Sequence, residues 1–199
     1  MKANTNMKAS ALLLCASFLC AVSVFSTIAF LKSDDSVENT FTVGKVSVSL
    51  DESKVDEYGT ADAAADRVKA NTYKLIPGHR YTKNPTVHFA ADSEASYLFV
   101  KVENGLAEIE TDAEADAKIE AQILANGWEK LDGAANVFFR KVDANSTDSA
   151  LDYAVFGSFT LDENAEVARY EHARITVTAY AIQSDGFDSA SAAWAAGAF

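Results

Sequence analysis

The chain has 199 residues and a formal net charge of −12, from 29 acidic and 17 basic side chains. A chain this acidic is not built to bind nucleic acid or anionic lipid, because both carry negative charge that repels it. The length allows one domain with a hydrophobic core of useful size.

The N-terminal residues form an export signal. Residues 9–31 carry no charge, Lys2 and Lys8 precede them, and Thr27-Ile28-Ala29 supplies small residues near their end. This order is typical of a secretory signal peptide, and we expect cleavage between Ala29 and Phe30. The apolar run is also long enough to cross a bilayer, so an uncleaved membrane anchor is the alternative. Both alternatives predict a protein that leaves the cytoplasm.

Cleavage after Ala29 would leave 170 residues (199 − 29) with a net charge of −14, since the two lysines removed change −12 by −2. Cys15 and Cys20 both lie in the apolar run, so the mature part contains no cysteine. An exported domain without disulfides fits a Gram-positive bacterium better than a eukaryotic secretory pathway or an oxidising periplasm.

The mature sequence predicts several β-strands. Apolar residues alternate at 41 and 43 and then at 46, 48 and 50, with a change of phase at Gly44-Lys45 that indicates a bulge. The last predicted strand is apolar on both faces, which favours a central place in a sheet. The expected organisation is a signal (1–29), a flexible link (30–40) and one domain (41–199). Further strands are expected over residues 86–90, 97–103, 137–142, 155–161 and 174–183.

Three short helices are expected between the strands. Thr111 and Glu114 form a capping box, and Asn126-Gly127 ends the helix that follows. A weaker helix is expected over residues 61–70, and a short alanine-rich one over 189–195 buries Trp194. About seven strands with inserted short helices and only two prolines favour a mostly β fold, an antiparallel β-sandwich, over a βαβ fold.

The sequence offers no catalytic motif, so we expect no enzyme and no cofactor. Hydrolytic zinc usually needs two histidines one helical turn apart with a glutamate base. None of the three histidines has that spacing, and they stay weak candidates for a metal site assembled in space: His79, His88 and His172. Nucleophile elbows and phosphate-binding loops are also missing. Asn145-Ser146-Thr147 matches a glycosylation acceptor, which we interpret as a chance match.

Three stretches together resemble the TasA/camelysin family of exported Gram-positive proteins. They are residues 29–35 (AFLKSDD), residues 39–46 (NTFTVGKV) and residues 75–85 (LIPGHRYTKNP). The sequence departs from the family at Leu31-Lys32, where the family usually has an aromatic residue and then a threonine or asparagine. In the third stretch, Pro77-Gly78 predicts a type II turn, and Lys83 completes the family turn motif. The basic residues beside this turn, His79, Arg80 and Lys83, are expected in solvent, and the alternative is that they bind an acidic neighbour.

The resemblance implies a jelly-roll-like sandwich that is secreted or held on the cell surface. It also implies assembly into biofilm matrix fibres, in which the N-terminal segment of one subunit fills a strand-shaped gap in the next. The donor-strand candidates are Phe41, Val43, Val46 and Val48, and the alternative is that this strand completes its own sandwich. Expected partners are other copies of the chain, a related matrix protein and a SipW-type signal peptidase. Two other functions stay open: a camelysin-like surface metallo-endopeptidase and a monomeric surface binding module.

Overall fold

The computed structural model describes residues 32–34, 45–113 and 118–197. The chain divides into two compact units, Met1–Phe30 and Leu31–Phe199, and every described residue belongs to the second. The expected cleavage residues Ala29 and Phe30 and the donor candidates Phe41 and Val43 lie outside the described residues. Among the described residues, none of the helices combines the length and apolar character that a bilayer crossing needs.

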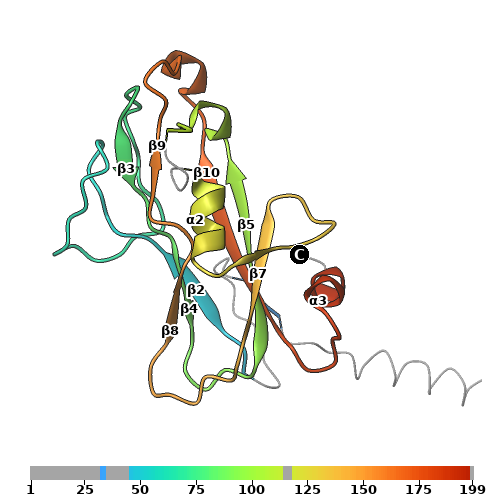
Figure 1. Ribbon diagram of the computed structural model, residues 1–199. Helices are drawn as coiled ribbons and strands as arrows, with labels where there is room; N and C mark the ends of the chain where they lie inside the picture. The colour runs from blue at the N-terminus through green and yellow to red at the C-terminus, as the bar shows by residue number, and fades with distance from the viewer. Residues whose placement is uncertain (1–31, 35–44, 114–117, 198–199) are drawn as a thin grey trace, which may run out of the picture. The chain divides into compact units, whose positions relative to one another are not determined.

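The described part is mostly β, as expected, and all of its strand pairs are antiparallel. A five-stranded sheet has the order β1-β10-β5-β7-β6, a three-stranded sheet the order β2-β4-β8, and β3 pairs with β9 (Figure 1). The strands are β1 (Lys32–Asp34), β2 (Val48–Asp51), β3 (Arg80–Thr82), β4 (Thr86–Phe89), β5 (Ser96–Asn104), β6 (Glu129–Lys130), β7 (Val137–Val142), β8 (Leu151–Ala154), β9 (Ser158–Thr160) and β10 (Ile175–Gln183).

One hydrophobic core joins the three sheets. Alternation along β5 and β10 turns one set of apolar side chains toward it, and β4, β3 and β9 supply the facing set. Helix α2 (Ile119–Ala125) adds Ile119 and Ile123, and its Gln122 side chain donates to the Ser158 carbonyl and accepts from the Gly157 amide. The core includes Tyr81, Val87, Phe89, Leu98, Val100, Phe159, Ala179 and Ala181.

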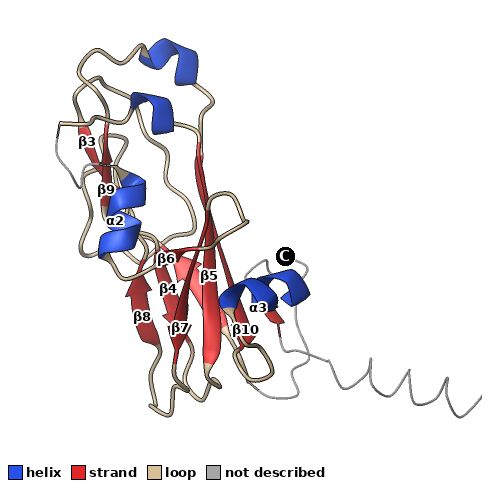
Figure 2. Ribbon diagram, turned by 45° about the vertical axis from the view of Figure 1, so that its right-hand side comes forward, coloured by secondary structure: helices blue, strands red, loops and turns tan. Residues whose placement is uncertain are grey.

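The five-stranded sheet is also covered on its other face. Helix α3 (Ala190–Gly197) lies beside β5 and β10 (Figure 2). Its Trp194 ring lies 5.1 Å from the Phe99 ring and 5.6 Å from the Tyr180 ring, measured between centroids. Burial on both faces explains why β5 and β10 carry apolar residues at odd and even positions alike.

Several predicted elements are confirmed, and others are wrong. The strands expected over 86–90, 97–103, 137–142 and 174–183 correspond to β4, β5, β7 and β10. α2 begins at Ile119 rather than after Thr111, whose hydroxyl instead accepts from the Ala113 amide. Asn126 caps it and Gly127 has a φ of +81°, as the sequence predicts. Residues 32–34, expected in the flexible link, form β1.

The helix expected over residues 61–70 is wrong. Backbone pairing replaces it there: Ala61 pairs with Val55, and Val68 pairs with Glu52. The Glu52 and Val68 amides each donate to the other residue's carbonyl, at 2.9 and 2.8 Å. Residues 52–79 therefore form a long connection between β2 and β3, called here the β2–β3 excursion. Two 3₁₀ helices, η1 (Ala107–Ile109) and η2 (Val167–Tyr170), complete the described elements.

Candidate functional site: the open edge of strand β10

The two halves of β10 have different neighbours. Tyr180, Ala181 and Ile182 lie between β1 and β5, whereas residues 175–179 pair with β5 on one side only within the described part of the chain. The register places Ile175 opposite Asn104 and Gln183 opposite Ser96. A strand edge of five residues therefore has no second strand partner among the described residues.

The hydrogen-bond pattern shows which backbone groups lie along that edge. The Gly105 amide donates to the Arg174 carbonyl, and the Ser184 amide donates to the Ala95 carbonyl. The Val102 amide donates away from β10, to the Asn136 carbonyl on the β7 side. Antiparallel ladders alternate, so even-numbered residues of β10 bond to β5 and the amides and carbonyls of residues 175, 177 and 179 face the other way. These groups can accept an added strand.

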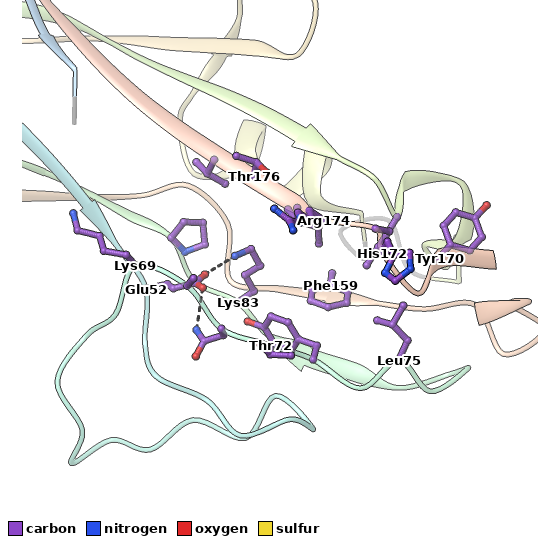
Figure 3. Close-up of a pocket in the computed structure, with 18 of the residues that line it drawn as sticks. Glu52, Lys69, Thr72, Leu75, Lys83, Phe159, Tyr170, His172, Arg174 and Thr176 are labelled. Atoms are coloured by element: carbon purple, nitrogen blue, oxygen red, sulfur yellow. Dashed lines mark hydrogen bonds and ion pairs between the residues drawn. The ribbon is translucent and has the colours of Figure 1, made fainter. Parts of the chain in front are cut away.

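A groove of about 880 Å³ lies beside this edge. Residues 173–177 line one side, and Leu50, Asp51 and Glu52 line another. Residues 69–75 of the β2–β3 excursion, called here the groove wall, supply six more lining residues, all except Lys74. Figure 3 shows Arg174, just before β10, and Thr176 on β10 across from Glu52, Lys83 and Thr72. The apolar lining consists of Leu50, Tyr73, Leu75, Pro85, Leu106, Phe159, Ile175 and Val177.

A buried ion pair lies in the groove lining. Lys83 Nζ donates to Glu52 Oε2 at 2.6 Å, and the two side chains are only 10% and 5% exposed. Asn71 Nδ2 donates to the other carboxylate oxygen at 2.9 Å, and Asn71 Oδ1 accepts from the Val55 amide. The carboxylate is thus paired and hydrogen-bonded, the condition under which a charge tolerates burial.

The buried carboxylate also affects Tyr73 of the groove wall. Burial, and then the negative charge of Glu52, raises the pKa of the Tyr73 phenol well above its usual range. The phenol stays protonated and donates to the Thr82 carbonyl. The Tyr73 ring meets Tyr81 and Phe159 edge to face, at 5.7 and 5.4 Å between centroids. The wall is therefore anchored to the core through an aromatic cluster.

Of the donor-strand candidates, the structure describes Val46 and Val48. They are 1% and 5% exposed and belong to the core of their own domain. β2 pairs with β4 from Val48 opposite Phe89 to Asp51 opposite Thr86. These two valines are already packed in their own chain, so they are not free to fill a gap in a neighbour.

The residues of the turn motif have two different places in the structure: Pro77-Gly78 form a backbone turn, and Lys83 is buried in the lining of the groove. Gly78 has a φ of +72° and the His79 amide donates to the Ile76 carbonyl, the geometry that Pro77-Gly78 predicts. Lys83, expected in solvent, is instead buried with Glu52. Nothing near Lys83 in the sequence signals this, because its partner lies 31 residues earlier in the chain.

The three histidines lie in different parts of the fold: His79 just before β3, His88 on β4 and His172 in the connection after η2. His79 contacts the Tyr58 carbonyl through Nε2, and its ring lies 4.6 Å from the Tyr81 ring. His88 lies on β4 between two carboxylates, and His172 lines the groove. Among the described residues, no three histidine, cysteine or acidic side chains are grouped as metal ligands would be.

Asn145 of the glycosylation-like triplet is 1% exposed. Its Nδ2 donates to the carbonyls of Phe89, Ala90 and Ser149, and its Oδ1 accepts from the amide and hydroxyl of Thr147. An amide that is buried and fully hydrogen-bonded in this way is a structural link between loops, and no glycan fits there.

Known proteins add no relative to this description: no protein-family model matches the chain, and no curated protein or solved structure does so either. The resemblance to the TasA/camelysin family stays a prediction from the three sequence stretches that carry it.

Proposed function

We propose that this chain is a secreted or cell-surface structural protein of the extracellular matrix, whose subunits assemble into fibres by β-strand addition. One observation carries the proposal: the outward backbone groups of Ile175, Val177 and Ala179 have no strand partner among the described residues, and Ile175 and Val177 line a groove. Export through the predicted signal peptide, a jelly-roll-like sandwich and membership of the TasA/camelysin family belong to the same proposal.

The sequence of the open edge supports strand addition. Residues 175–179 read Ile-Thr-Val-Thr-Ala and contain no charge and no proline. Soluble proteins usually protect exposed edges with lysine, proline or a bulge, because an unprotected edge pairs with other chains. An uncharged, β-branched edge beside an apolar groove suits a strand that brings main-chain hydrogen bonds and alternating apolar side chains.

The burial of Val46 and Val48 confines the donor to residues before Lys45. Phe41 and Val43, two residues apart, then supply the side chains for the neighbour's groove, because alternate residues of a strand share one face. A donor and an acceptor on different parts of one molecule make a head-to-tail contact. Such a contact does not close on itself, and it produces filaments.

The test compares the mature chain, which begins at Phe30, with a chain that begins at Lys45. We expect the first to form filaments in electron micrographs as its concentration rises. The second should stay monomeric in sedimentation and keep a β-sheet circular dichroism spectrum, because it loses the three-residue edge strand β1 but retains Val46 and every residue of the core described above. A labelled peptide of residues 30–44 should bind to the shorter chain, and so should one of residues 35–44, which lacks the β1 residues and cannot re-form β1 beside residues 180–182.

A second variant covers the case in which the shorter chain fails to fold. Phe41→Asp combined with Val43→Asp in the mature chain keeps the length but places charges where apolar side chains are needed. It should not form filaments, whereas Ser36→Asp combined with Glu38→Gln, which leaves the net charge unchanged, should. Equal assembly by all variants contradicts strand donation. A mature chain that stays monomeric at every concentration supports the binding module instead, and stoichiometric zinc with chelator-sensitive proteolysis supports the metallo-endopeptidase.

A further inference from the structure

His88 links the three strands of the smaller sheet through their charged side chains. It lies on β4, the middle strand. Its Nδ1 is 2.6 Å from Asp152 Oδ1 on β8, and its Nε2 is 2.8 Å from Asp51 Oδ1 on β2. Its side chain is 18% exposed, against 26% for Asp51 and 62% for Asp152. Each ring nitrogen therefore faces a carboxylate oxygen of a different neighbouring strand.

Only the protonated ring satisfies both contacts. An imidazolium has two N–H donors, whereas a neutral imidazole has one N–H and one lone pair. After deprotonation, either Asp51 or Asp152 faces a lone pair instead of a donor. Burial, the largest single influence, lowers the pKa of His88, but hydrogen bonds to Asp51 and Asp152 and their negative charges together outweigh it and raise the pKa.

Asp51 connects this contact to the groove. The Arg67 guanidinium donates through Nε to the same carboxylate oxygen that His88 contacts. Arg67 Nη2 donates to the carbonyls of Asp51 and Asn84 and to the Thr86 hydroxyl, at 3.1, 3.2 and 3.0 Å. The groove wall begins two residues after Arg67, at Lys69, whose Nζ donates to the Leu50 carbonyl at 2.7 Å. The hydrogen bond from Lys69 therefore links the groove wall to β2 at Leu50, next to Asp51, the residue that His88 contacts.

We propose that protonated His88 is an acid-stabilised clasp that holds β2, β4 and β8 together and, through Asp51 and Arg67, fixes the wall of the groove. The described charged groups that act on the ring are Asp51 from β2 and Asp152 from β8, while Arg67 from the excursion acts through Asp51. The clasp is a property of the folded chain. Its role in controlling strand acceptance rests on the proposed function.

The direction of the pH dependence follows from the raised pKa. A group whose pKa is higher in the folded state stabilises that state fully below its unfolded value, which for histidine is about 6.5. That stabilisation is lost as the pH rises through the folded value. Asp51 acts at more acidic pH: its pKa is lowered despite burial, by hydrogen bonds from His88 and Arg67 and by their charges. The clasp is therefore strongest in mild acid and weakens toward alkaline pH.

The first experiment measures the clasp in the mature chain at concentrations below assembly. NMR titration of the His88 ring should show it titrating at a higher pH than an unperturbed histidine, whose pKa is about 6.5. Urea unfolding at about pH 5.5 and about pH 8.5, on either side of the unfolded histidine pKa, should show a midpoint that falls with pH. His88→Gln should flatten this dependence, and His172→Gln should leave it as it is. A His88 ring that titrates no higher than an unperturbed histidine, or equal pH dependence in both variants, overturns the clasp.

A milder variant keeps the test decisive if His88→Gln does not fold. Asp152→Asn changes an exposed carboxylate and leaves the contact with Asp51 in place. Asp152→Asn should lower the pH at which His88 titrates, since one of its two carboxylate partners is lost. It should also reduce the pH dependence of the urea midpoint to roughly half. No change in the titration of His88 would contradict the proposal.

The last measurement separates the clasp from the acceptor function. Hydrogen exchange of residues 67–75 should lose protection on the order of tenfold between the two pH values, relative to β5 in the same sample. The labelled peptide of residues 30–44 should bind more weakly to the chain that begins at Lys45 at the higher pH. Loss of protection without peptide binding at either pH retains the clasp and contradicts the strand-accepting groove. Protection that is equal at both pH values overturns the clasp itself.

Discussion

The two halves of β10 show how one strand can be both structural and available. Residues 180–182 lie between β1 and β5, and Tyr180 also contacts Trp194 of α3. Residues 175–179 have the same alternation and the same partner, β5, but no second strand among the described residues, and residues 175–177 line a groove. The two halves differ in what lies beside them and not in their own sequence pattern. An open edge therefore arises only when the sheet is assembled.

The groove beside the open half stays intact without an added strand because its polar groups are satisfied internally. Glu52 is bonded to Lys83 and Asn71, and Tyr73 to the Thr82 carbonyl. Among the described residues, no buried side-chain nitrogen or oxygen lacks a hydrogen-bond partner. An incoming strand therefore has to supply only backbone pairing and apolar contact, since it does not need to neutralise a buried charge.

The largest effect is expected from breaking the ion pair in the groove. Lys83→Met leaves the Glu52 carboxylate buried without its cation, and we expect a loss of about 3–5 kcal/mol in the free energy of unfolding, measured with urea. The double variant Glu52→Gln, Lys83→Met should recover most of that loss, because it removes both charges and keeps an amide beside Asn71.

The matched control for that experiment is Lys101→Met on β5. Lys101 pairs with Glu103, but the two side chains are 40% and 58% exposed. Exposed pairs contribute little, so the change should be within about 0.5 kcal/mol. A loss at Lys83 no greater than that at Lys101 would show that the groove does not depend on a buried pair.

A proline pair tests the difference between the two sides of β10 directly. The Thr178 amide bonds to β5, so Thr178→Pro should cost about 2–3 kcal/mol through a lost ladder bond and an unsatisfied carbonyl. The Val177 amide faces the groove, so Val177→Pro should cost about 1 kcal/mol, because no internal ladder bond is lost. Despite the smaller cost, Val177→Pro should reduce binding of the 30–44 peptide strongly, measured by fluorescence anisotropy.

Two outcomes would break that interpretation. Equal destabilisation by the two prolines would mean that both amides are bonded inside the domain, and that the edge is closed. Unchanged peptide binding by Val177→Pro would mean that the peptide binds elsewhere on the surface.

The long strands could be predicted from the sequence because their pattern is local. Residues 97–103, 137–142 and 174–183 alternate or stay apolar over six residues or more, and all three form strands. The two-residue β6, the three-residue β3 and the four-residue β8 are too short to show a period. The false helix over 61–70 has a helix-like composition, but Ala61 and Val68 pair with Val55 and Glu52, and residues 63–64 between them form a turn.

The groove could not be predicted, because its parts come together only in the fold. Glu52 and Lys83 are 31 residues apart, and His88 meets Asp152 across 64 residues. The sequence does place β10 within a sheet, since both of its faces are apolar. Apolar faces report what lies above and below a strand, whereas an open edge depends on what lies beside it.

The smallest effect is expected at β1, which covers the closed half of β10. Ser33 lies opposite Ala181, and odd-numbered residues of β10 direct their backbone groups toward β1. Ser33→Pro should therefore remove one ladder bond and cost about 1 kcal/mol in urea unfolding. Asp34 lies opposite Tyr180, whose backbone bonds to β5. Asp34→Pro should therefore lower the free energy of unfolding by only a few tenths of about 1 kcal/mol. Neither variant touches residues 175–179, so both should bind the 30–44 peptide as the parent chain does. If Asp34→Pro is the more damaging of the two, the alternation along β10 is reversed, and Thr176 and Thr178 become the residues that offer their backbone to an added strand.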